Sequence, residues 1–494
     1  MKFTPNCDQF IKLSKSYDLI AVQAKFTTDS ETPLSAYCKL SSYKPSFLFE
    51  SVVGGEQVSR FSFVGCDPRK VIQCGHNETK VFERDKQTIE LPTPQDPLSI
   101  VEEIIGKNRY FGPEVDQRFS GGAVGYIAYE YANRIEPTIP VPDSDDLELP
   151  LLFFMIADTV LIFDHAFQTF SICANVEVSS DPEAQYNEAC SRIKSIIEML
   201  KQPHALSLTQ FEQGFDPPTV TGNFTKEKFL ELVNQTKEYI KSGDIIQAVL
   251  SQRITQPFSG SPINLYRAIR AINPSPYMFL METSDFAIVG ASPEVHVRLS
   301  EKRVLIRPIA GTRPRGSSKQ EDSDNERDLL ADEKEKAEHL MLVDLARNDI
   351  GRVCKPGSVK AAEFMTIERY SHVMHIVSEV IGELEENCTG FDLMRATFPA
   401  GTVSGAPKVR AMQIISEFEN LQRNAYAGAL GYFGFEGNHD SCIAIRTAMI
   451  SDGKIHLQAG AGIVADSIPE NEYEETLNKA KGMLKAIKMA EGIH

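Results

Sequence analysis

The chain has 494 residues, of which 42% are hydrophobic and 24% charged, an ordinary balance for a globular protein. Its 51 basic and 68 acidic residues give a formal charge of −17, which argues against non-specific nucleic-acid binding and against a basic membrane-surface protein. No apolar run approaches the roughly 20 residues of a membrane span, and the N-terminus lacks a secretory layout. The nine scattered cysteines include no CxxC pair, so we expect reduced thiols, no structural zinc and a cytoplasmic location.

Three regions are expected along the chain. Residues 206–223 are predicted to be a linker, because they are polar, carry Pro217-Pro218 and show no sustained period. Residues 1–205 form an N-terminal region that ends in a helix over 184–200, and residues 224–494 form a region denser in motifs. Strand-like runs occupy 46–51, 60–64, 151–163, 169–176, 428–434, 441–450 and 454–459. Strands that follow one another through short glycine turns favour antiparallel sheets with helices packed outside, an α+β fold.

A helix that ends at Gly243 is followed by a predicted strand over 245–254. Strand alternation places Gln247, Ser251 and Arg253 on one face and apolar residues, Ile246 among them, on the other. A face with these polar side chains can line a cavity. The period alone favours the simpler interpretation, a solvent-exposed face.

Two further helices carry acidic stripes. Glu335 and Glu338 share one face of the helix over 332–349. Glu472, Glu475 and Lys479 form a stripe along the helix over 470–487. Carboxylate oxygens are suitable ligands for Mg²⁺, but each stripe by itself is more typical of a solvated helix face.

Glycine-rich segments at 308–312, 399–408 and 458–462 can turn backbone N–H groups toward an anion. A helix that begins after Pro407 would add a positive N-terminus, with Lys408 beside it. Each segment alone is more typical of a turn. Arg446 is a charge within the predicted strand 441–450 and therefore requires a partner. His375 alternates with apolar residues and is expected to face inward.

Taken together, these segments resemble the chorismate-utilising enzymes, and within that family the large subunits of anthranilate synthases. The likeness runs in family order from about residue 224 to the C-terminus and is weaker in the first half, at 47–51 and 120–126. The motifs are GDIIQAVLSQR (243–253), ASPE (291–294), PIAGT (308–312), EHLMLVDLARND (338–349), FPAGTVSGAPK (398–408), QAGAG (458–462) and the acidic segment 472–479.

The resemblance implies one large unit with two subdomains, in which two stacked antiparallel sheets enclose a central cleft and helices pack outside. It implies Mg²⁺ as cofactor, held by Glu338 and Glu475 with Glu335 and Glu472 supporting through water. The implied substrate contacts are Arg446, Tyr426 and the backbone of Gly460 to Gly462 for the pyruvyl carboxylate, and Thr312, Gly311 and Lys479 near the ring carboxylate and the metal.

The implied reaction converts chorismate and ammonia to anthranilate and pyruvate, the first step of tryptophan biosynthesis. Glu294 is the candidate general acid for the leaving C4 hydroxyl, and His375 the candidate acceptor of the C2 proton. Sister enzymes that use water place an activating Lys where this chain has Gln247. Aminodeoxychorismate synthases place a nucleophilic Lys where this chain has Ala310. That activity is the alternative, and a non-catalytic regulatory homologue is a less favoured one.

The resemblance also implies two partners besides chorismate. No cysteine lies in the nucleophilic elbow of a glutamine amidotransferase, so a second subunit is expected to supply ammonia from glutamine. Tryptophan is expected to inhibit from a separate site made of two segments. Their residues are Leu48, Glu50 and Ser51 in the first segment, and Asn273, Pro274, Ser275, Tyr277 and Met278 in the second. Phe49 replaces the usual second leucine of the first segment.

Overall fold

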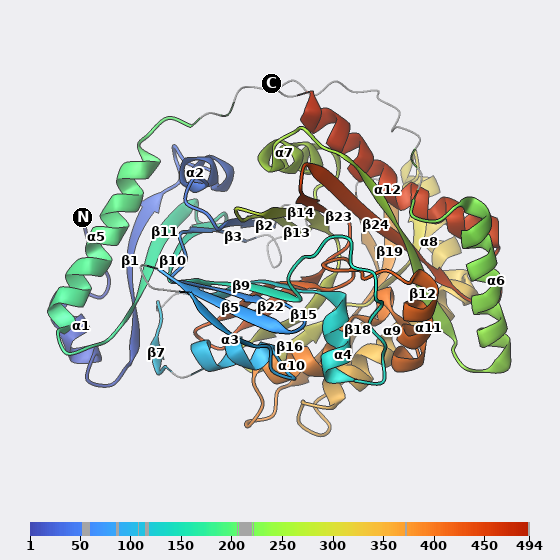
Figure 1. The fold of residues 1–494 in the computed structure, drawn as a ribbon, viewed down its shortest axis with the longest axis horizontal. Coiled ribbons are helices and arrows are strands. Elements are labelled where there is room, and N and C mark those ends of the chain that lie inside the picture. Colours follow the sequence, from blue (N-terminus) through green and yellow to red (C-terminus); the bar gives the residue numbers. More distant parts are fainter. Residues whose placement is uncertain are drawn as a thin grey trace.

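A computed structural model describes residues 1–51, 60–84, 88–106, 108–113, 118–204, 206, 220, 222–370 and 373–492. Within these residues the strands form two sheets of 12 strands each. All neighbouring strands are antiparallel except β1 and β7, which are parallel. Figure 1 shows one sheet stacked over the other, with helices on the outside. This arrangement confirms the predicted α+β fold class.

The first sheet has the order β20 (Gly405–Ala406), β12 (Gln247–Pro257), β24 (Lys454–Ile463), β23 (Thr447–Ser451), β14 (Phe286–Ser292), β13 (Tyr277–Glu282), β2 (Ser46–Glu50), β3 (Phe61–Cys66), β10 (Thr159–Asp164), β11 (Thr169–Glu177), β1 (Leu19–Thr27) and β7 (Tyr110–Phe111). Its outer face packs on helices through a buried apolar cluster. The helices on this face are α1 (Cys7–Leu13), α2 (Pro33–Leu40), α5 (Pro182–Leu200), α7 (Pro262–Ile272) and α12 (Pro469–Glu491).

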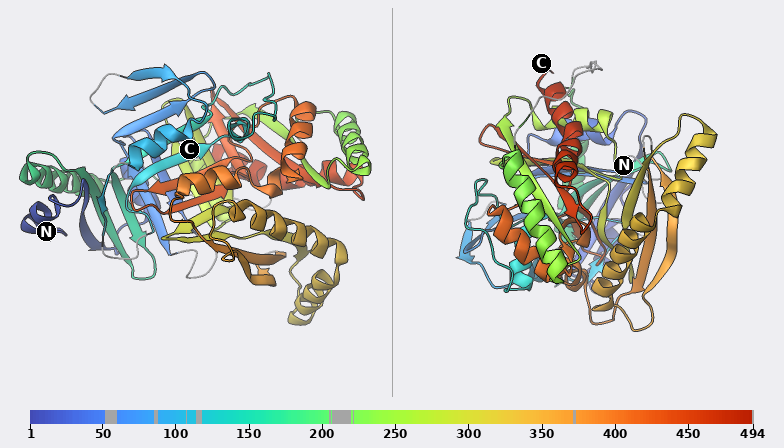
Figure 2. Two further views of the ribbon diagram at one scale, coloured as in Figure 1. Left: turned by 90° about the horizontal axis from the view of Figure 1, so that it is seen from below. Right: turned by 90° about the vertical axis from the view of Figure 1, so that its right-hand side faces the viewer.

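The second sheet has the order β17 (Ile309–Pro314), β19 (Val373–Glu383), β16 (Arg303–Ile306), β15 (Val295–Ser300), β22 (His439–Ile443), β21 (Ala429–Gly434), β8 (Gly122–Ile127), β9 (Leu152–Ala157), β4 (Lys70–Cys74), β5 (Glu78–Glu83) and β6 (Ile89–Pro92), with β18 (Lys360–Arg369) also on β19. The remaining helices are α3 (Leu98–Ile105), α4 (Ala132–Ile135), α6 (Lys226–Ser242), α8 (Lys319–Ala331), α9 (Glu333–Gly351), α10 (Gly390–Thr397) and α11 (Lys408–Glu419), with 3₁₀ turns η1 (Tyr129–Tyr131) and η2 (Gly401–Val403). Figure 2 shows α8 at the periphery of the molecule.

The largest apolar cluster contains residues of both sheets, among them Phe63 of β3 and Phe153 of β9, and fills the space between them. Each sheet joins the two halves of the chain. In the first sheet β2 pairs with β13, and Phe49 lies opposite Phe279. In the second sheet β8 pairs with β21. The division at 206–223 stays a prediction, because most of that range lies outside the described residues.

Several local predictions are confirmed and others are corrected. Helix α6 ends at Gly243, which adopts the left-handed conformation (φ 84°) as expected of a C-terminal stop. The predicted strand 151–163 is instead two strands, β9 and β10, joined at the buried Asp158. The predicted strand 441–450 is also interrupted between β22 and β23. No helix in the described ranges is long and apolar enough to cross a bilayer.

Candidate active site

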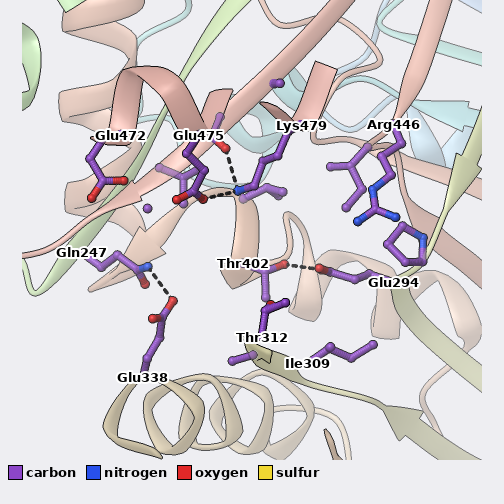
Figure 3. Close-up of a pocket in the computed structure, with 18 of the residues that line it drawn as sticks. Gln247, Glu294, Ile309, Thr312, Glu338, Thr402, Arg446, Glu472, Glu475 and Lys479 are labelled. Atoms are coloured by element: carbon purple, nitrogen blue, oxygen red, sulfur yellow. Dashed lines mark hydrogen bonds and ion pairs between the residues drawn. The ribbon is translucent and has the colours of Figure 1, made fainter. Parts of the chain in front are cut away.

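A cavity of about 570 Å³ lies where β12, β17 and β24 meet helices α9 and α12 (Figure 3). Most of the predicted site residues line it, although they come from distant parts of the chain. They are Gln247, Glu294, Gly311, Thr312, Glu335, Glu338, Tyr426, Arg446, Gly460, Gly462, Glu472, Glu475 and Lys479. The fold thus brings the predicted substrate and metal residues together in one place.

The polar face of β12 is not a solvent face, which corrects the interpretation favoured by its period. Gln247, Ser251 and Arg253 are 1–5% exposed, whereas Ile246, expected on a buried face, is 60% exposed. The strand lies between β20 and β24. The chain around Glu419 and Gln422 covers its polar face, where Glu419 contacts Ser251 and the Gln422 carbonyl accepts from Arg253. Gln247 reaches the cavity and donates a hydrogen bond from Nε2 to Glu338 Oε1 at 3.3 Å.

Two of the glycine-rich segments are strands rather than turns. Residues 309–314 form β17, and residues 458–462 lie inside β24. Neighbouring groups approach two glycines of β24 closely, and glycine is required at Gly460, where a Cβ would lie 2.8 Å from the Leu250 carbonyl oxygen. A Cβ at Gly462 would lie 2.4 Å from Gln247 Nε2, and one at Gly460 would lie 2.9 Å from the Tyr426 hydroxyl. The glycines therefore allow side chains of neighbouring segments to reach the cavity wall.

Arg446 supplies the cationic end of the cavity. It connects β22 to β23 in the left-handed region (φ 50°), so its side chain leaves the sheet instead of packing within a strand. The guanidinium forms no ion pair or hydrogen bond with any residue that the structure describes. Burial lowers its pKa, and the charge of Glu294 opposes this effect. An unpaired guanidinium in a cavity is suited to binding a carboxylate.

Lys408, which the sequence places beside the N-terminus of a helix, is paired within the fold. Helix α11 does begin after Pro407, but Lys408 Nζ pairs with Asp349 Oδ2 at 2.8 Å and donates to the Thr397 carbonyl at 3.1 Å. Since both partners are protein groups, this lysine links α11 to α9 and the chain after α10. Its charge is already neutralised within the fold.

Glu294 is arranged as a proton donor. Burial raises the pKa of its carboxyl group, whereas the Thr402 hydroxyl, which donates to Oε2 at 3.0 Å, acts in the opposite direction. A carboxyl group with a raised pKa keeps its proton to a higher pH. Thr402 was not singled out from the sequence, because nothing distinguishes it from the other residues of its glycine-rich segment.

His375 is half-buried on β19 and does not itself line the cavity, but it contacts two residues that do. Its Nδ1 lies 2.9 Å from the Gly311 carbonyl and 3.1 Å from Thr312 Oγ1. Since a carbonyl can only accept, Nδ1 carries the proton and Nε2 has a free lone pair. Burial lowers the pKa of His375. The neutral ring is therefore competent as a base.

Figure 3 shows Glu338 of α9 across the cavity from Glu472 and Glu475 of α12, and Glu335 of α9 lines the same cavity. Burial, followed by the neighbouring Glu338, raises the pKa of Glu335. Burial also raises the pKa of Glu472, with Glu475 adding to the effect. The acidic stripes are thus cavity walls rather than purely solvated faces. Glu475 is still 47% exposed, and Lys479 Nζ pairs with it at 2.7 Å.

These oxygen donors fit Mg²⁺, which takes one or two carboxylates plus waters and substrate oxygens and needs no complete protein cage. The carboxylate pairs disfavour each other's charge, which a divalent cation would relieve. No three acidic, histidine or cysteine side chains of the described residues are close enough to hold a metal by themselves. The site therefore suits an ion that shares its coordination with a bound anion.

A buried ion pair supports the cavity from behind. Arg423 Nη2 contacts Glu419 Oε1 at 2.6 Å, and both side chains are at most 4% exposed. The same guanidinium donates to the carbonyls of Val249 and Val403, which line the cavity. It also lies over the ring of Tyr426. No local pattern marks Arg423 in the sequence, since its partners come from three separate segments.

The segments predicted to bind tryptophan are adjacent, since Met278 of β13 lies opposite Glu50 of β2. Glu50, Ser51, Tyr277 and Met278 line a cavity of about 60 Å³ between the sheets. The other members of the set do not line it: Leu48, Asn273, Pro274 and Ser275. The Ser51 hydroxyl is buried and has no hydrogen-bond partner among the described residues. A cavity of this size holds only a few waters, so a larger ligand would require its walls to move apart.

Residues 44–485 match the profile of a family described as chorismate binding enzyme. The chain is a member of this family. Over 99% of its length, and 99% of theirs, it is 46% identical to anthranilate synthase component 1 of Aquifex aeolicus and of Acetivibrio thermocellus. The chain thus belongs to the anthranilate synthase component 1 group of the chorismate binding family, as the sequence motifs predicted.

Solved structures agree with this membership of the chorismate binding family. The structure of anthranilate synthase component I from Streptococcus pneumoniae superposes with a TM-score of 0.75 at 35% identity, over 93% of this chain and 99% of that one. The menaquinone-specific isochorismate synthase of Escherichia coli superposes with a TM-score of 0.72 at 17% identity, over 97% and 98% of the two chains. The second comparison shows a shared fold alone.

Proposed function

We propose that this chain is the catalytic component of an anthranilate synthase. It converts chorismate and ammonia to anthranilate, pyruvate and water in the first step of tryptophan biosynthesis. The observation that carries the proposal is the cavity, which combines an unpaired Arg446, a protonatable Glu294 and facing acidic helices in a chain nearly half identical to known component 1 proteins. Two lining residues favour ammonia as the nucleophile. Gln247 cannot act as the base that would activate water, and Ala310 has no nucleophilic side chain.

Substrate binding is assigned to the two ends of the cavity. Arg446, with Tyr426 and the backbone of Gly460 to Gly462, receives the pyruvyl carboxylate. Thr312, Gly311 and Lys479 lie near the ring carboxylate, on the side of the acidic helices. Lys479 Nζ is tied to the Gly460 carbonyl at 2.9 Å, so this lysine also holds the wall on which the substrate rests. A dianion is thus retained inside a protein of net charge −17 by local groups.

Two proton transfers are assigned to Glu294 and His375. As ammonia forms its bond to C2 of the ring, the C4–O bond breaks and the Glu294 proton passes to the departing oxygen, which leaves as water. The C2 proton then passes to His375 Nε2 as pyruvate is eliminated and the ring becomes aromatic. A positioned acid or base of this kind contributes roughly 10²–10⁴-fold to the rate.

Glu338 and Glu475 are proposed to hold Mg²⁺, with Glu335 and Glu472 supporting through water. When bound, the ion supplies fixation of the ring carboxylate and compensation of its charge. Glu475 also forms an ion pair with Lys479 of the same helix, which does not depend on the metal ion. It keeps one of the four carboxylates compensated and aligned with the cavity.

Two partners follow from the same proposal. A glutamine amidotransferase subunit supplies ammonia, since component 1 of the relatives implies a second component. Tryptophan acts as a feedback inhibitor at the Ser51 cavity, which is separate from the catalytic one. The Ser51 hydroxyl has no hydrogen-bond partner within the part of the chain that the structure describes, and this supports the assignment because a ligand can use such a polar group. The protein is expected to act in the cytoplasm.

One assay tests the proposed reaction. The purified chain is incubated with chorismate, Mg²⁺ and an ammonium salt, and products are followed by fluorescence and mass spectrometry. Anthranilate and pyruvate should appear in equal amounts, and only when Mg²⁺ is present. Accumulation of aminodeoxychorismate would assign the chain to the alternative activity, and absence of any chorismate turnover would support a non-catalytic homologue.

A further inference from the structure

A second, smaller cavity of about 40 Å³ lies behind Glu294. It shares the walls Glu294, Thr402 and Leu342 with the catalytic cavity. The volume is enough for at least one water molecule, which needs roughly 10–15 Å³. The remaining question is whether the walls offer hydrogen-bond partners that the fold has not already used.

His296 offers such a partner. It is 3% exposed, lines the small cavity and has no hydrogen bond at Nε2 among the described residues. The residue lies in a β-bulge, because the pairing of β15 with β22 shifts between Val295 and Val297. Bulges next to active sites change the direction of a side chain. The ring is therefore not constrained by the regular alternation of β15.

A chain of hydrogen bonds fixes the tautomer of His296. His439 Nδ1 lies 2.8 Å from the Tyr432 carbonyl, which can only accept, so Nδ1 carries the proton and Nε2 accepts. Ser441 Oγ, 3.0 Å from that Nε2, donates its one hydrogen to it rather than to the Val297 carbonyl, which is farther away at 3.4 Å. Ser441 Oγ then accepts from His296 Nδ1 at 3.1 Å. His296 Nε2 is consequently a lone pair that can only accept, and the Thr397 carbonyl near the ring cannot satisfy it because a carbonyl also only accepts.

The rings in this chain are neutral, which the tautomer assignment requires. Burial lowers the pKa of His296 to about 3 and that of His439 to about 4. The other charged residues that line the small cavity already have partners. Asp349 pairs with Lys408 at 2.8 Å, and Arg307 pairs with Glu368 and Glu379.

Glu294 offers the second partner. Its Oε2 accepts from Thr402, and its Oε1 makes no hydrogen bond with the residues that the structure describes. A water in the small cavity can donate one hydrogen to Oε1 and the other to His296 Nε2, which leaves the single proton of Glu294 on Oε2 for transfer into the catalytic cavity. We infer that the small cavity is a binding site for a water molecule that links Glu294 to His296, and that His296 is a positioning residue for the proposed general acid.

The evidence for the water site is the cavity and the hydrogen-bond chain. Its effect on turnover rests on the proposed function. The link fixes the orientation of the Glu294 carboxyl group, so that its proton stays on the oxygen that serves the catalytic cavity. A water-mediated bond is nearly as favourable as a direct one, so its loss lowers kcat by up to about tenfold. The Michaelis constant for chorismate is unaffected, because His296 does not line the catalytic cavity.

The experiment compares the wild-type chain with His296→Phe and His296→Gln, by crystallography at high resolution and by kinetics with chorismate and ammonium. His296→Phe keeps a ring but removes the acceptor, whereas His296→Gln retains an acceptor oxygen. We expect a water bound to both Glu294 and His296 in the wild type, its absence from His296→Phe, a lower kcat for that variant, and recovery in His296→Gln.

Three results would overturn the inference. They are the absence of an ordered water between Glu294 and His296 in wild-type crystals, density that persists in His296→Phe, and an equal kcat for the two variants. Thermal unfolding of all three proteins checks that the variants fold. Absence of anthranilate from the wild type would overturn the proposed function alone, because the crystallographic comparison does not depend on turnover.

Discussion

At the scale of single residues, Thr402 helps to set the pKa of Glu294 and thereby the pH range in which Glu294 can donate a proton. The Thr402 hydroxyl donates to the Glu294 carboxyl and holds its pKa below the value that burial alone would set. A general acid must be protonated, so turnover falls as the pH rises through this pKa. His375 must be neutral, and burial lowers its pKa, so its protonation limits turnover only at lower pH.

Thr402→Val should therefore shift the alkaline limb of the kcat profile to higher pH, because the pKa of Glu294 rises when its donor is lost. Glu294→Gln should lower kcat by roughly 10²–10⁴-fold at every pH. Both are measured as anthranilate formation against pH. Thr447→Val is the matched control, because that hydroxyl also belongs to the cavity wall but donates to the Ile445 carbonyl. A shift of the limb to lower pH in Thr402→Val would contradict the assignment.

The acidic residues give a second prediction at this scale. Glu338→Ala and Glu475→Ala should each lose Mg²⁺-dependent turnover and weaken Mg²⁺ binding in calorimetry, while the unfolding temperature stays close to that of the wild type. Glu474→Ala is the control, since Glu474 neighbours Glu475 on α12 but is exposed and pairs with Lys226. Normal Mg²⁺ dependence in Glu338→Ala or Glu475→Ala would remove that carboxylate from the site.

At the scale of elements, Arg423 ties helix α11 to β12 and to η2. Arg423→Met should destabilise the protein by about 3–5 kcal/mol, because it leaves the buried Glu419 carboxylate without its partner. Denaturant unfolding measures the loss. Arg410→Met, on helix α11 that also carries Glu419, is the control and should change stability little, because Arg410 and Asp244 form a solvent-screened pair. Equal effects for the two variants would show that burial does not decide the contribution of these ion pairs.

At the scale of the whole molecule, the catalytic cavity and the Ser51 cavity are separate but nearly contiguous. A cavity of about 20 Å³, distinct from the one behind Glu294, shares Tyr277 and Arg298 with the Ser51 cavity, and Pro293 and Ile309 with the catalytic one. Movement of the walls around Ser51 would therefore reach the catalytic cavity through packed side chains. A coupling of about 1–3 kcal/mol between two such sites is typical.

Tryptophan should inhibit wild-type turnover and lose its effect on Ser51→Phe, because the larger ring fills the cavity and removes the free hydroxyl. Turnover of chorismate should be largely kept, since Ser51 does not line the catalytic cavity. Inhibition curves for both proteins at fixed chorismate measure this. A wild type that is indifferent to tryptophan, or a Ser51→Phe variant that stays equally sensitive, would refute the regulatory assignment and leave the catalytic one intact.

The supply of ammonia gives the other prediction for the whole protein. The purified chain should make anthranilate from ammonium salts but not from glutamine, because it lacks a nucleophilic cysteine elbow. Rates with each nitrogen source, measured on the same preparation, decide this. Glutamine-dependent turnover by the single chain would reveal a second active site within it.

The sequence alone determined the fold class, some of the helices and strands, and many of the residues that line the catalytic cavity. Hydrophobic period and helix stops are local properties, so they predicted α6, α12 and the limits of many strands. Motif order identified the family before any geometry was known. For Gln247 and the acidic stripes, the spacing of polar residues favoured a solvent-exposed face, whereas the family motifs favoured a cavity. The spacing was misleading, because it cannot show what packs against a face.

Only the tertiary structure decided which groups meet. Pairing of β12 with β24 buries Gln247 against Gly462, and the approach of α9 and α12 places Glu338 and Glu475 on one cavity. The sequence placed Lys408 beside a helix N-terminus that could face an anion, and only the fold shows that its partner is Asp349. His296 carries no signal in the sequence, since its partner Ser441 is distant along the chain. Arg423 pairs with Glu419 four residues earlier, but only the fold brings it to the carbonyls of Val249 and Val403. Burial and hydrogen bonding depend on contacts between segments, and these contacts set the charge and tautomer of each group.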